Sequence, residues 1–407
     1  MYQNLALLAA FAFMYSVVAG GLARTWVNGA VVFTLFGVAL GPLGLGWLQL
    51  TLDANGIRLI AELTLAMVLF TDAAHADLGV LKRNVRIPER LLMLSLPLTI
   101  LFGFAVAWLL FDHLSMLEMA ILATMLAPTD AALGKAVVSD PSVPAPIREG
   151  LNFESGLNDG ICVPILFLLL ALAEGQRGDH GISILALHLM AEEIGIGVLV
   201  AMVVSVPGAW LLKRCSRHQW LEESWLQVPV VAMAVTCFAL AQASGGSGFI
   251  AAFIGGLVFG WLTKHHPLKH VILERAEGVG DLFSLITWVA FGAVVISKSH
   301  SAFDWHILLY SILSLTVIRM LPVFVSLAGL KLALGEKLFI GWFGPRGLAS
   351  IVFAVIVYNS DLPGVHTISM TVVCTIILSV LLHGLSATPL VAALAQRAKG
   401  HAQTAKS

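Results

Sequence analysis

The stretch Leu151-Asn-Phe-Glu-Ser-Gly-Leu-Asn-Asp-Gly160 runs directly into the apolar segment Ile161-Cys-Val-Pro-Ile-Leu-Phe-Leu-Leu-Leu-Ala-Leu-Ala173. The apolar segment predicts a helix that crosses a membrane and carries Glu154 and Asp159 with it. A charge at that depth costs several kcal/mol, and ionisable residues there usually mark an ion or proton pathway. Glu154, Asn158 and Asp159 are therefore candidate functional residues.

The composition places the whole chain in a membrane. Of its 407 residues, 58% are hydrophobic and only 12% are charged, and the mean hydropathy is +0.92. A soluble domain needs far more surface charge than this. The four cysteines are scattered and show no metal-ligand or disulfide spacing. No G-x-x-x-x-G-K-[ST] run is present, so we expect no ATP. We also expect no cofactor and no nucleic-acid partner.

Apolar runs predict an all-α polytopic protein of about thirteen transmembrane helices. Basic residues predict its orientation, because they gather on the cytoplasmic side of a membrane protein. With the N-terminus outside and the C-terminus inside, only Arg58, Arg177 and Lys298 of the 23 lysines and arginines fall on the outer side. Arg319 and Arg346 fall within predicted spans.

Two predicted spans contain helix-breaking sequences. Pro128-Thr129 interrupts the fifth span next to Asp130, and Gly344-Pro-Arg-Gly347 interrupts the twelfth. Paired breaks at corresponding positions of two halves are typical of transporter binding sites. Spans 1–6 and 8–13 then form two inverted six-helix repeats with broken crossing helices 5 and 12, linked by helix 7.

The polar residues of the sixth span occupy two helical faces. Ser155 and Asp159 are four residues apart, as are Glu154 and Asn158. Hydroxyl and carboxylate oxygens are hard ligands that suit a small monovalent cation. Glu154 requires a cationic partner, which either Arg319 or Arg346 could supply, and a pair of this kind is mainly structural.

These residues resemble those of monovalent cation–proton antiporters, most closely the NhaP-type sodium/proton antiporters that are related to the mammalian sodium/proton exchangers. The resemblance covers nearly the whole chain. The matching runs are Pro128-Thr-Asp130, Asp140-Pro-Ser-Val-Pro144, Ile147-Arg-Glu-Gly-Leu-Asn152, Glu154-Ser-Gly-Leu-Asn-Asp-Gly160, Arg319 and Gly344-Pro-Arg-Gly347.

The resemblance implies a role for each residue of the ion site. Asp159 binds the cation or the proton, and Asp130 is the second acidic residue. Ser155 is a direct or water-linked ligand, and Thr129 contributes its backbone carbonyl. Asn158 stands where electrogenic relatives carry a second aspartate.

Three further residues have supporting roles by the same resemblance. Glu154 and Arg319 form a buried structural pair, and Arg346 neutralises the crossing of the broken helices. Asp72, near the inner end of the third span, is a candidate for the cytoplasmic approach.

The resemblance also implies a domain organisation and a homodimer. A dimerisation scaffold holds still while a core bundle moves. The expected parts are scaffold helices 1–3 in 1–90, core helices 4–6 in 91–174, linker helix 7 in 175–224, scaffold helices 8–10 in 225–300, core helices 11–13 in 301–391, and a short cytoplasmic tail in 392–407.

The sequence therefore predicts a secondary transporter of the bacterial inner membrane that is not an enzyme. It would exchange Na⁺, or Li⁺ or K⁺, for H⁺ by alternating access. Because Asn158 adds no titratable charge, we expect one proton per cation and no net charge moved. The rival functions are a passive cation channel, a sodium–substrate symporter and an intramembrane aspartyl protease that uses Asp130 and Asp159.

Overall fold

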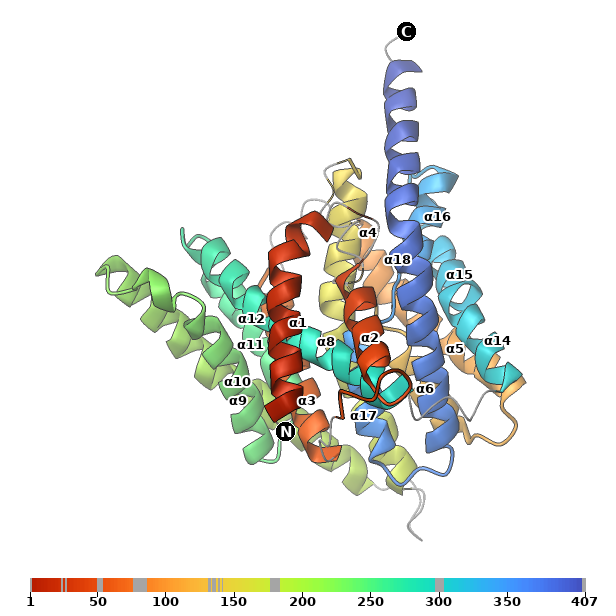
Figure 1. Cartoon of the computed structure of the whole chain (residues 1–407), viewed down its shortest axis with the longest axis horizontal. Helices are drawn as coiled ribbons and strands as arrows, with labels where there is room; N and C mark the ends of the chain where they lie inside the picture. The colour runs from red at the N-terminus through yellow and green to blue at the C-terminus, as the bar shows by residue number, and fades with distance from the viewer. Residues whose placement is uncertain are drawn as a thin grey trace. The chain divides into compact units, whose positions relative to one another are not determined.

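The structure is a computed structural model that describes residues 2–22, 25, 28–49, 54–75, 86–130, 133, 137, 140, 142–175, 184–296 and 304–404. Among these residues every regular element is a helix (Figure 1). Arg177 and Lys298, which the orientation prediction uses, lie outside the described residues.

The chain divides into two compact units. The first unit comprises Met1–Ala54, Asn84–Asn158 and Leu285–Ser407, and the second comprises Asn55–Arg83 and Asp159–Ser284. The stretch Leu151–Gly160 lies on the helix α8 (Ala145–Gly175). The boundary between the two units falls within this helix, between Asn158 and Asp159.

The first unit contains the N-terminal helices, the helices around the two breaks and the long C-terminal helix. Its elements are α1 (Tyr2–Leu22), α2 (Gly29–Leu40), α4 (Arg86–Arg90), the π-helix η1 (Leu91–Ser95), α5 (Leu96–Leu110), α6 (Met116–Met125), the start of α8 (Ala145–Gly175), the π-helix η3 (Phe291–Ile296), α14 (Trp305–Leu315), α15 (Val317–Ser326), α16 (Leu334–Trp342), α17 (Leu348–Tyr358) and α18 (Val365–Thr404).

The second unit is a group of adjacent helices in which α9 packs against α10 and α11 (Figure 1). Its elements are α3 (Ala54–His75), the rest of α8, α9 (Ile184–Arg217), the 3-10 turn η2 (Glu223–Trp225), α10 (Val228–Ala243), α11 (Gly248–Leu262) and most of α12 (Lys269–Ala290).

The helices have the length and composition of membrane spans. Within the described residues, eight helical segments are long and apolar enough to cross a bilayer, and four shorter apolar helices accompany them. The shorter ones are α2, α6, α11 and α17. An all-helical multi-pass membrane protein is thus confirmed, while the count of thirteen crossings and the inverted repeat stay predictions.

Polar caps begin several of these helices. The Ser115 hydroxyl accepts a hydrogen bond from the Glu118 N–H, and the Glu118 carboxylate accepts one from the Ser115 N–H. This capping box fixes where α6 starts. Asp304 similarly caps α14, its carboxylate accepting a hydrogen bond from the His306 N–H at 3.1 Å.

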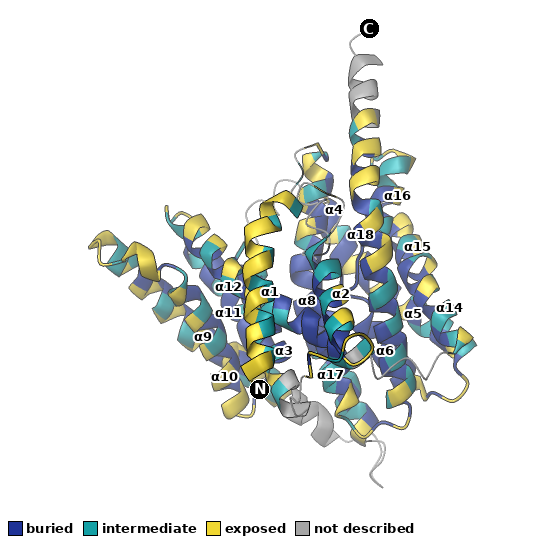
Figure 2. Cartoon of the chain, in the orientation of Figure 1, coloured by how far each residue is buried: buried dark blue, intermediate teal, exposed yellow. Residues whose placement is uncertain are grey.

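The exposed surface is strongly apolar. None of the residues of α1 is buried, and Figure 2 shows this helix largely exposed along its length. An apolar helix without a buried face requires an apolar environment, which a lipid bilayer provides.

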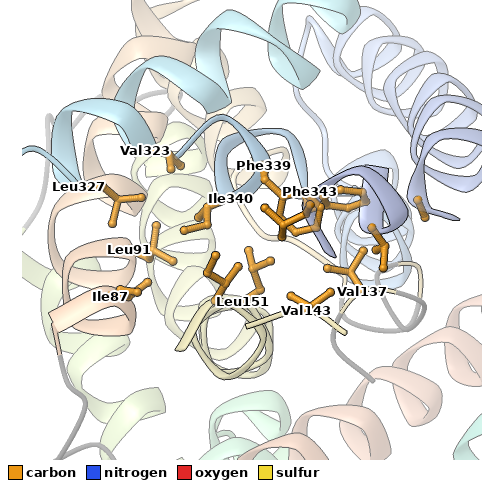
Figure 3. Packing of buried hydrophobic residues seen from close by; sticks show 14 residues of the cluster. Ile87, Leu91, Val137, Val143, Leu151, Val323, Leu327, Phe339, Ile340 and Phe343 are labelled. Atoms are coloured by element: carbon orange, nitrogen blue, oxygen red, sulfur yellow. The ribbon is translucent and has the colours of Figure 1, made fainter. Parts of the chain in front are cut away.

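A hydrophobic cluster in the first unit fixes α16 next to the second break. Leu151 of α8, Val323 of α15 and Phe343 after α16 belong to this cluster of buried side chains (Figure 3). The same cluster includes Leu91 of η1 and Ile340 of α16. Burial of a large aliphatic or aromatic side chain contributes about 1.5–3 kcal/mol, so the position where α16 ends is strongly determined.

Candidate ion-translocation site

Both predicted helix breaks are present, and both are buried. The first break covers residues 126–130, where α6 has ended at Met125 and Pro128 lacks an N–H to continue it. The second break covers residues 343–347, between the end of α16 at Trp342 and the start of α17 at Leu348. Non-helical backbone at membrane depth needs partners for its N–H and C=O groups, and these breaks find many of theirs in each other.

Hydrogen bonds connect the two breaks directly. The Asp130 N–H donates to the Pro345 carbonyl at 2.8 Å. The Ser350 hydroxyl, one turn into α17, donates to the Met125 carbonyl at 2.9 Å at the end of α6. Two short apolar helices therefore meet end to end at the breaks.

Asp130 places its carboxylate at the start of α17. Its Oδ2 accepts a hydrogen bond from the Leu348 N–H at 2.8 Å, and its Oδ1 accepts one from the Leu133 N–H at 3.1 Å. A helix N-terminus carries partial positive charge and unpaired N–H groups, so an anion is favourable there. A Cβ on Gly347 would lie 1.9 Å from Asp130 Oδ2, so this contact requires glycine.

Arg346 makes the reciprocal contact with the end of α6. Its Nη1 donates to the Ala127 carbonyl and, at 2.8 Å, to the Pro128 carbonyl. The residue is fully buried. Because the C-terminal end of a helix carries partial negative charge, the guanidinium neutralises it. Each break therefore sends a charged side chain to the helix end opposite it.

Two residues of α18 support the second break and were not in the predicted site. The Ser379 hydroxyl accepts a hydrogen bond from the Arg346 N–H at 2.7 Å and lies 3.2 Å from His383 Nδ1. His383 Nε2 lies 2.9 Å from the Trp342 carbonyl, to which it donates. Ser379 and His383 are four residues apart in an apolar helix, and this polar spacing is the signal in the sequence that could have identified them.

Glu154 pairs with Arg319, which resolves the choice between the two arginines. Arg319 Nη1 and Nη2 donate to Glu154 Oε1 and Oε2 at 2.5 and 2.7 Å. Both side chains are buried, one on α8 and one on α15. The two parallel bonds make this a strong, bidentate ion pair.

A cluster of polar side chains joins the first break to α8. Thr129 Oγ1 lies 3.0 Å from Ser155 Oγ and accepts a hydrogen bond from Asn158 Nδ2 at 2.8 Å. All three residues are buried. Asn158 Oδ1 is a buried acceptor with no hydrogen-bond partner among the described residues. An acceptor in that state is costly unless it binds something, so the cluster has spare oxygen ligand capacity.

Asp159 and Asp72 lie in the second unit. Asp159 follows Asn158 on α8, is 7% exposed, and is one helical turn from Ser155. Asp72 lies on α3 and is half-buried. Among the described residues, no three His, Cys, Asp or Glu side chains gather as a resident metal site. A transported cation would be a substrate held by mixed oxygen ligands.

The family follows from a comparison of the sequence. Residues 7–393 match the model of the transmembrane sodium/hydrogen exchanger family, which is nearly the whole chain. The chain belongs to the sodium/hydrogen exchanger family. This membership confirms the resemblance drawn from the sequence.

Relatives of this exchanger family member carry antiporter names. The chain is 24% identical over 385 residues to the K(+)/H(+) antiporter NhaP2 of Shewanella sp. (strain ANA-3), covering 94% of this chain and 65% of that protein. It is 26% identical over 364 residues to the Na(+)/H(+) antiporter 2 of Zygosaccharomyces rouxii, covering 83% of this chain and 43% of that protein. The chain thus spans less than two thirds of the length of these relatives.

A solved structure has the same fold. The sodium proton antiporter MjNhaP1 from Methanocaldococcus jannaschii superposes with a TM-score of 0.76 at 22% identity, covering 97% of this chain and 99% of that one. At 22% identity this likeness shows that the two chains share a fold, and nothing beyond the fold.

Proposed function

We propose that this exchanger family member transports a monovalent cation against a proton, without net movement of charge. The observation that carries the proposal is the buried Thr129–Ser155–Asn158 cluster, placed where two broken helices meet. Its oxygens suit Na⁺, Li⁺ or K⁺, and one relative is named for sodium exchange while another is named for potassium exchange.

Asp159 is the residue at which cation and proton compete in this proposal. An ionised carboxylate at membrane depth is costly, and either a cation or a proton neutralises it. If only the neutralised forms cross, every cation that moves one way requires a proton to move the other way. Ser155 is one turn away on the same helix and supplies an oxygen to the bound cation.

Asn158 sets the electrical balance. It is an amide that bonds to Thr129, and it neither binds nor releases a proton at any ordinary pH. A site with one titratable carboxylate exchanges one proton for one monovalent cation. The net charge moved in a cycle is then zero.

Asp130 and Arg346 hold the crossing in this mechanism. Both oxygens of Asp130 accept backbone N–H groups, which hold the carboxylate in place. Asp130 would therefore attract the bound ion by its negative charge rather than act as a ligand that moves freely. Glu154 and Arg319 fix α8 against α15. Asp72 would bias cations toward the cytoplasmic approach.

Alternating access would arise from movement of the core helices, in 91–174 and 301–391, against the scaffold helices in 1–90 and 225–300 of a homodimer. The N-terminus would lie outside a bacterial inner membrane and the C-terminus in the cytoplasm, as the asymmetry of the basic residues predicts.

Proton flux in proteoliposomes tests the proposal. Sodium, lithium and potassium gradients are imposed in turn on wild type, Asp159→Asn and Asp112→Asn. Asp112 is exposed in the turn after α5 and serves as the matched control for loss of a carboxylate. We expect cation-driven proton flux in wild type and Asp112→Asn and none in Asp159→Asn. Flux that persists in Asp159→Asn would contradict competition at this residue, and cation conduction without proton movement would support a channel.

A further inference from the structure

A basic cavity lies within the second unit, at the end of α9. It has a volume of about 430 Å³ and is lined by Lys213, Ser216 and Arg217 from the last turns of that helix. The turn between α11 and α12 closes it with His265 and His266. None of the described residues that line it is an aspartate or a glutamate. Two permanent cations thus share one small cavity without an acidic partner in its wall.

The orientation of His266 adds a hydrogen-bond donor to this cavity. Its Nδ1 accepts a hydrogen bond from the Leu268 N–H at 3.3 Å. Because Nδ1 must be unprotonated to accept, the neutral ring carries its proton on Nε2. The ring is therefore fixed in the tautomer that can donate to an anion.

The field in the cavity is positive enough to affect this histidine. Burial, followed by the charges of Lys213 and Arg217, lowers the pKa of His266 from its ordinary value. An anion placed between the two cations would relieve this repulsion. Like charges held close without a counterion raise the free energy of a fold, so the arrangement favours an anionic occupant.

Exposed tryptophans lie near the cavity, as is typical of helix ends at the level of lipid headgroups. Trp210 and Trp261 are exposed on α9 and α11, near the ends from which the cavity is built, and Trp220 is exposed just beyond α9. Tryptophan gathers at the interface between membrane and water. Basic cavities between helices at this level bind phosphate headgroups.

We propose that this cavity binds a phosphate-bearing anion, with Lys213 and Arg217 holding the charge and His266 donating a hydrogen bond. Ser216 supplies a further hydroxyl donor. The phosphate belongs either to the headgroup of an anionic phospholipid or to free phosphate. The site lies entirely in the second unit and requires neither Asp159 nor the helix crossing.

Binding to delipidated protein in detergent tests the proposal and separates the two sources of phosphate. Phosphatidylglycerol, phosphatidylcholine and inorganic phosphate are titrated separately, with retained lipid counted by native mass spectrometry and phosphate binding followed by thermal unfolding. The variant is Lys213→Gln with Arg217→Gln. The control is Arg214→Gln with Lys264→Gln, which also removes two positive charges, one from the end of α9 and one from the turn after α11, but spares the lining.

We expect phosphatidylglycerol to bind wild type and the control more tightly than phosphatidylcholine, and to bind the cavity variant roughly 30-fold more weakly, about fivefold for each cation removed. Binding of inorganic phosphate with the same dependence on the variant, and no preference between the lipids, would assign the site to free phosphate. Equal binding of every anion by the cavity variant and the control would overturn the proposal.

Protection of lysine from acylation covers the case in which the cavity variant does not fold. In wild type, the bound anion should slow acylation of Lys213 and leave Lys264 unaffected, since Lys264 is exposed on the same turn and outside the lining. Equal rates for Lys213 with and without the anions would contradict the site.

Discussion

The Glu154–Arg319 pair and the Asp130–Arg346 pair are both buried in the first unit, yet their charges are neutralised in different ways. Glu154 and Arg319 bond to each other. Asp130 and Arg346 each bond to backbone groups at the opposite helix end. The first pair thus joins two side chains directly, whereas the second also ties each side chain to the backbone at a helix end. The difference predicts which losses a second substitution can rescue.

The largest expected effect is loss of one member of the ion pair. Arg319→Met leaves Glu154 charged and buried without its partner, at a cost of about 3–5 kcal/mol. Adding Glu154→Gln should recover most of that loss, because removal of both charges leaves neither one stranded. Thermal unfolding of the two single variants and the double variant measures both effects. A double variant no more stable than Arg319→Met would show that the pair does more than neutralise itself.

The Asp130–Arg346 pair at the two helix breaks should respond differently to single and double substitution. Arg346→Met leaves the Ala127 and Pro128 carbonyls without their donor and should cost about 1.5–3 kcal/mol. Asp130→Asn should rescue little of it, because both carboxylate oxygens accept backbone N–H groups, from Leu348 and Leu133, which the substitution would disturb. The coupling energy from a double-mutant cycle should therefore be smaller than that of Glu154 and Arg319. Equal coupling energies in the two cycles would contradict a difference between the two pairs.

A smaller steric change tests the fit of Asp130 to α17. In Gly347→Ala the new Cβ would lie 1.9 Å from Asp130 Oδ2, so the carboxylate must move away from the Leu348 N–H. We expect a loss of about 1–3 kcal/mol, the usual cost of overpacking. Gly20→Ala in α1 is the control, because the added Cβ would meet nothing within 4 Å apart from its chain neighbours and the backbone of its own helix. Equal unfolding temperatures for the two variants would show that the close contact is unimportant.

The smallest effect concerns a helix cap at the surface. The Asp304 carboxylate accepts an N–H at the start of α14, as the Asp130 carboxylate does at the start of α17, but Asp304 lies at the surface of the protein. The His306 N–H holds the pKa of its carboxyl below the ordinary value of 3.8. Its contribution to stability is therefore present above pH 3.8 and is lost as the pH falls through the lower, folded value.

The measurement compares the unfolding temperature of wild type with that of Asp304→Asn between neutral and acidic pH. Asparagine can still cap but does not titrate, so the advantage of wild type should shrink as the carboxyl takes up its proton. A difference that is independent of pH would show that the charge of Asp304 contributes nothing to the cap.

Local sequence was sufficient to predict the helical membrane fold and both breaks. Proline and glycine act on their own helix, and runs of apolar residues act on their own span. For the same reason the polar face that includes Ser155 could be assigned in advance.

Partners distant in the sequence could not be assigned in this way. Arg319 and Arg346 have the same charge and both lie in apolar spans, so only the tertiary arrangement shows which one meets Glu154. The hydrogen bond from the Leu348 N–H to Asp130 depends on α17 beginning next to the first break. Ser379 and His383 are visible as a polar pair, but their contacts with the second break are not.

The dependence of transport on membrane voltage tests whether the single carboxylate of Asp159 makes the exchange electroneutral. Proton flux driven by a sodium gradient is measured in proteoliposomes with the membrane voltage either free or clamped, for wild type and for Asn158→Asp. The variant adds a second titratable carboxylate, to which the Thr129 hydroxyl can donate instead of accepting. Electroneutral exchange in wild type predicts that clamping the voltage leaves wild-type flux unchanged, and the added carboxylate predicts that it alters the flux of Asn158→Asp. Wild-type flux that depends on voltage, or that carries current, would contradict electroneutral exchange.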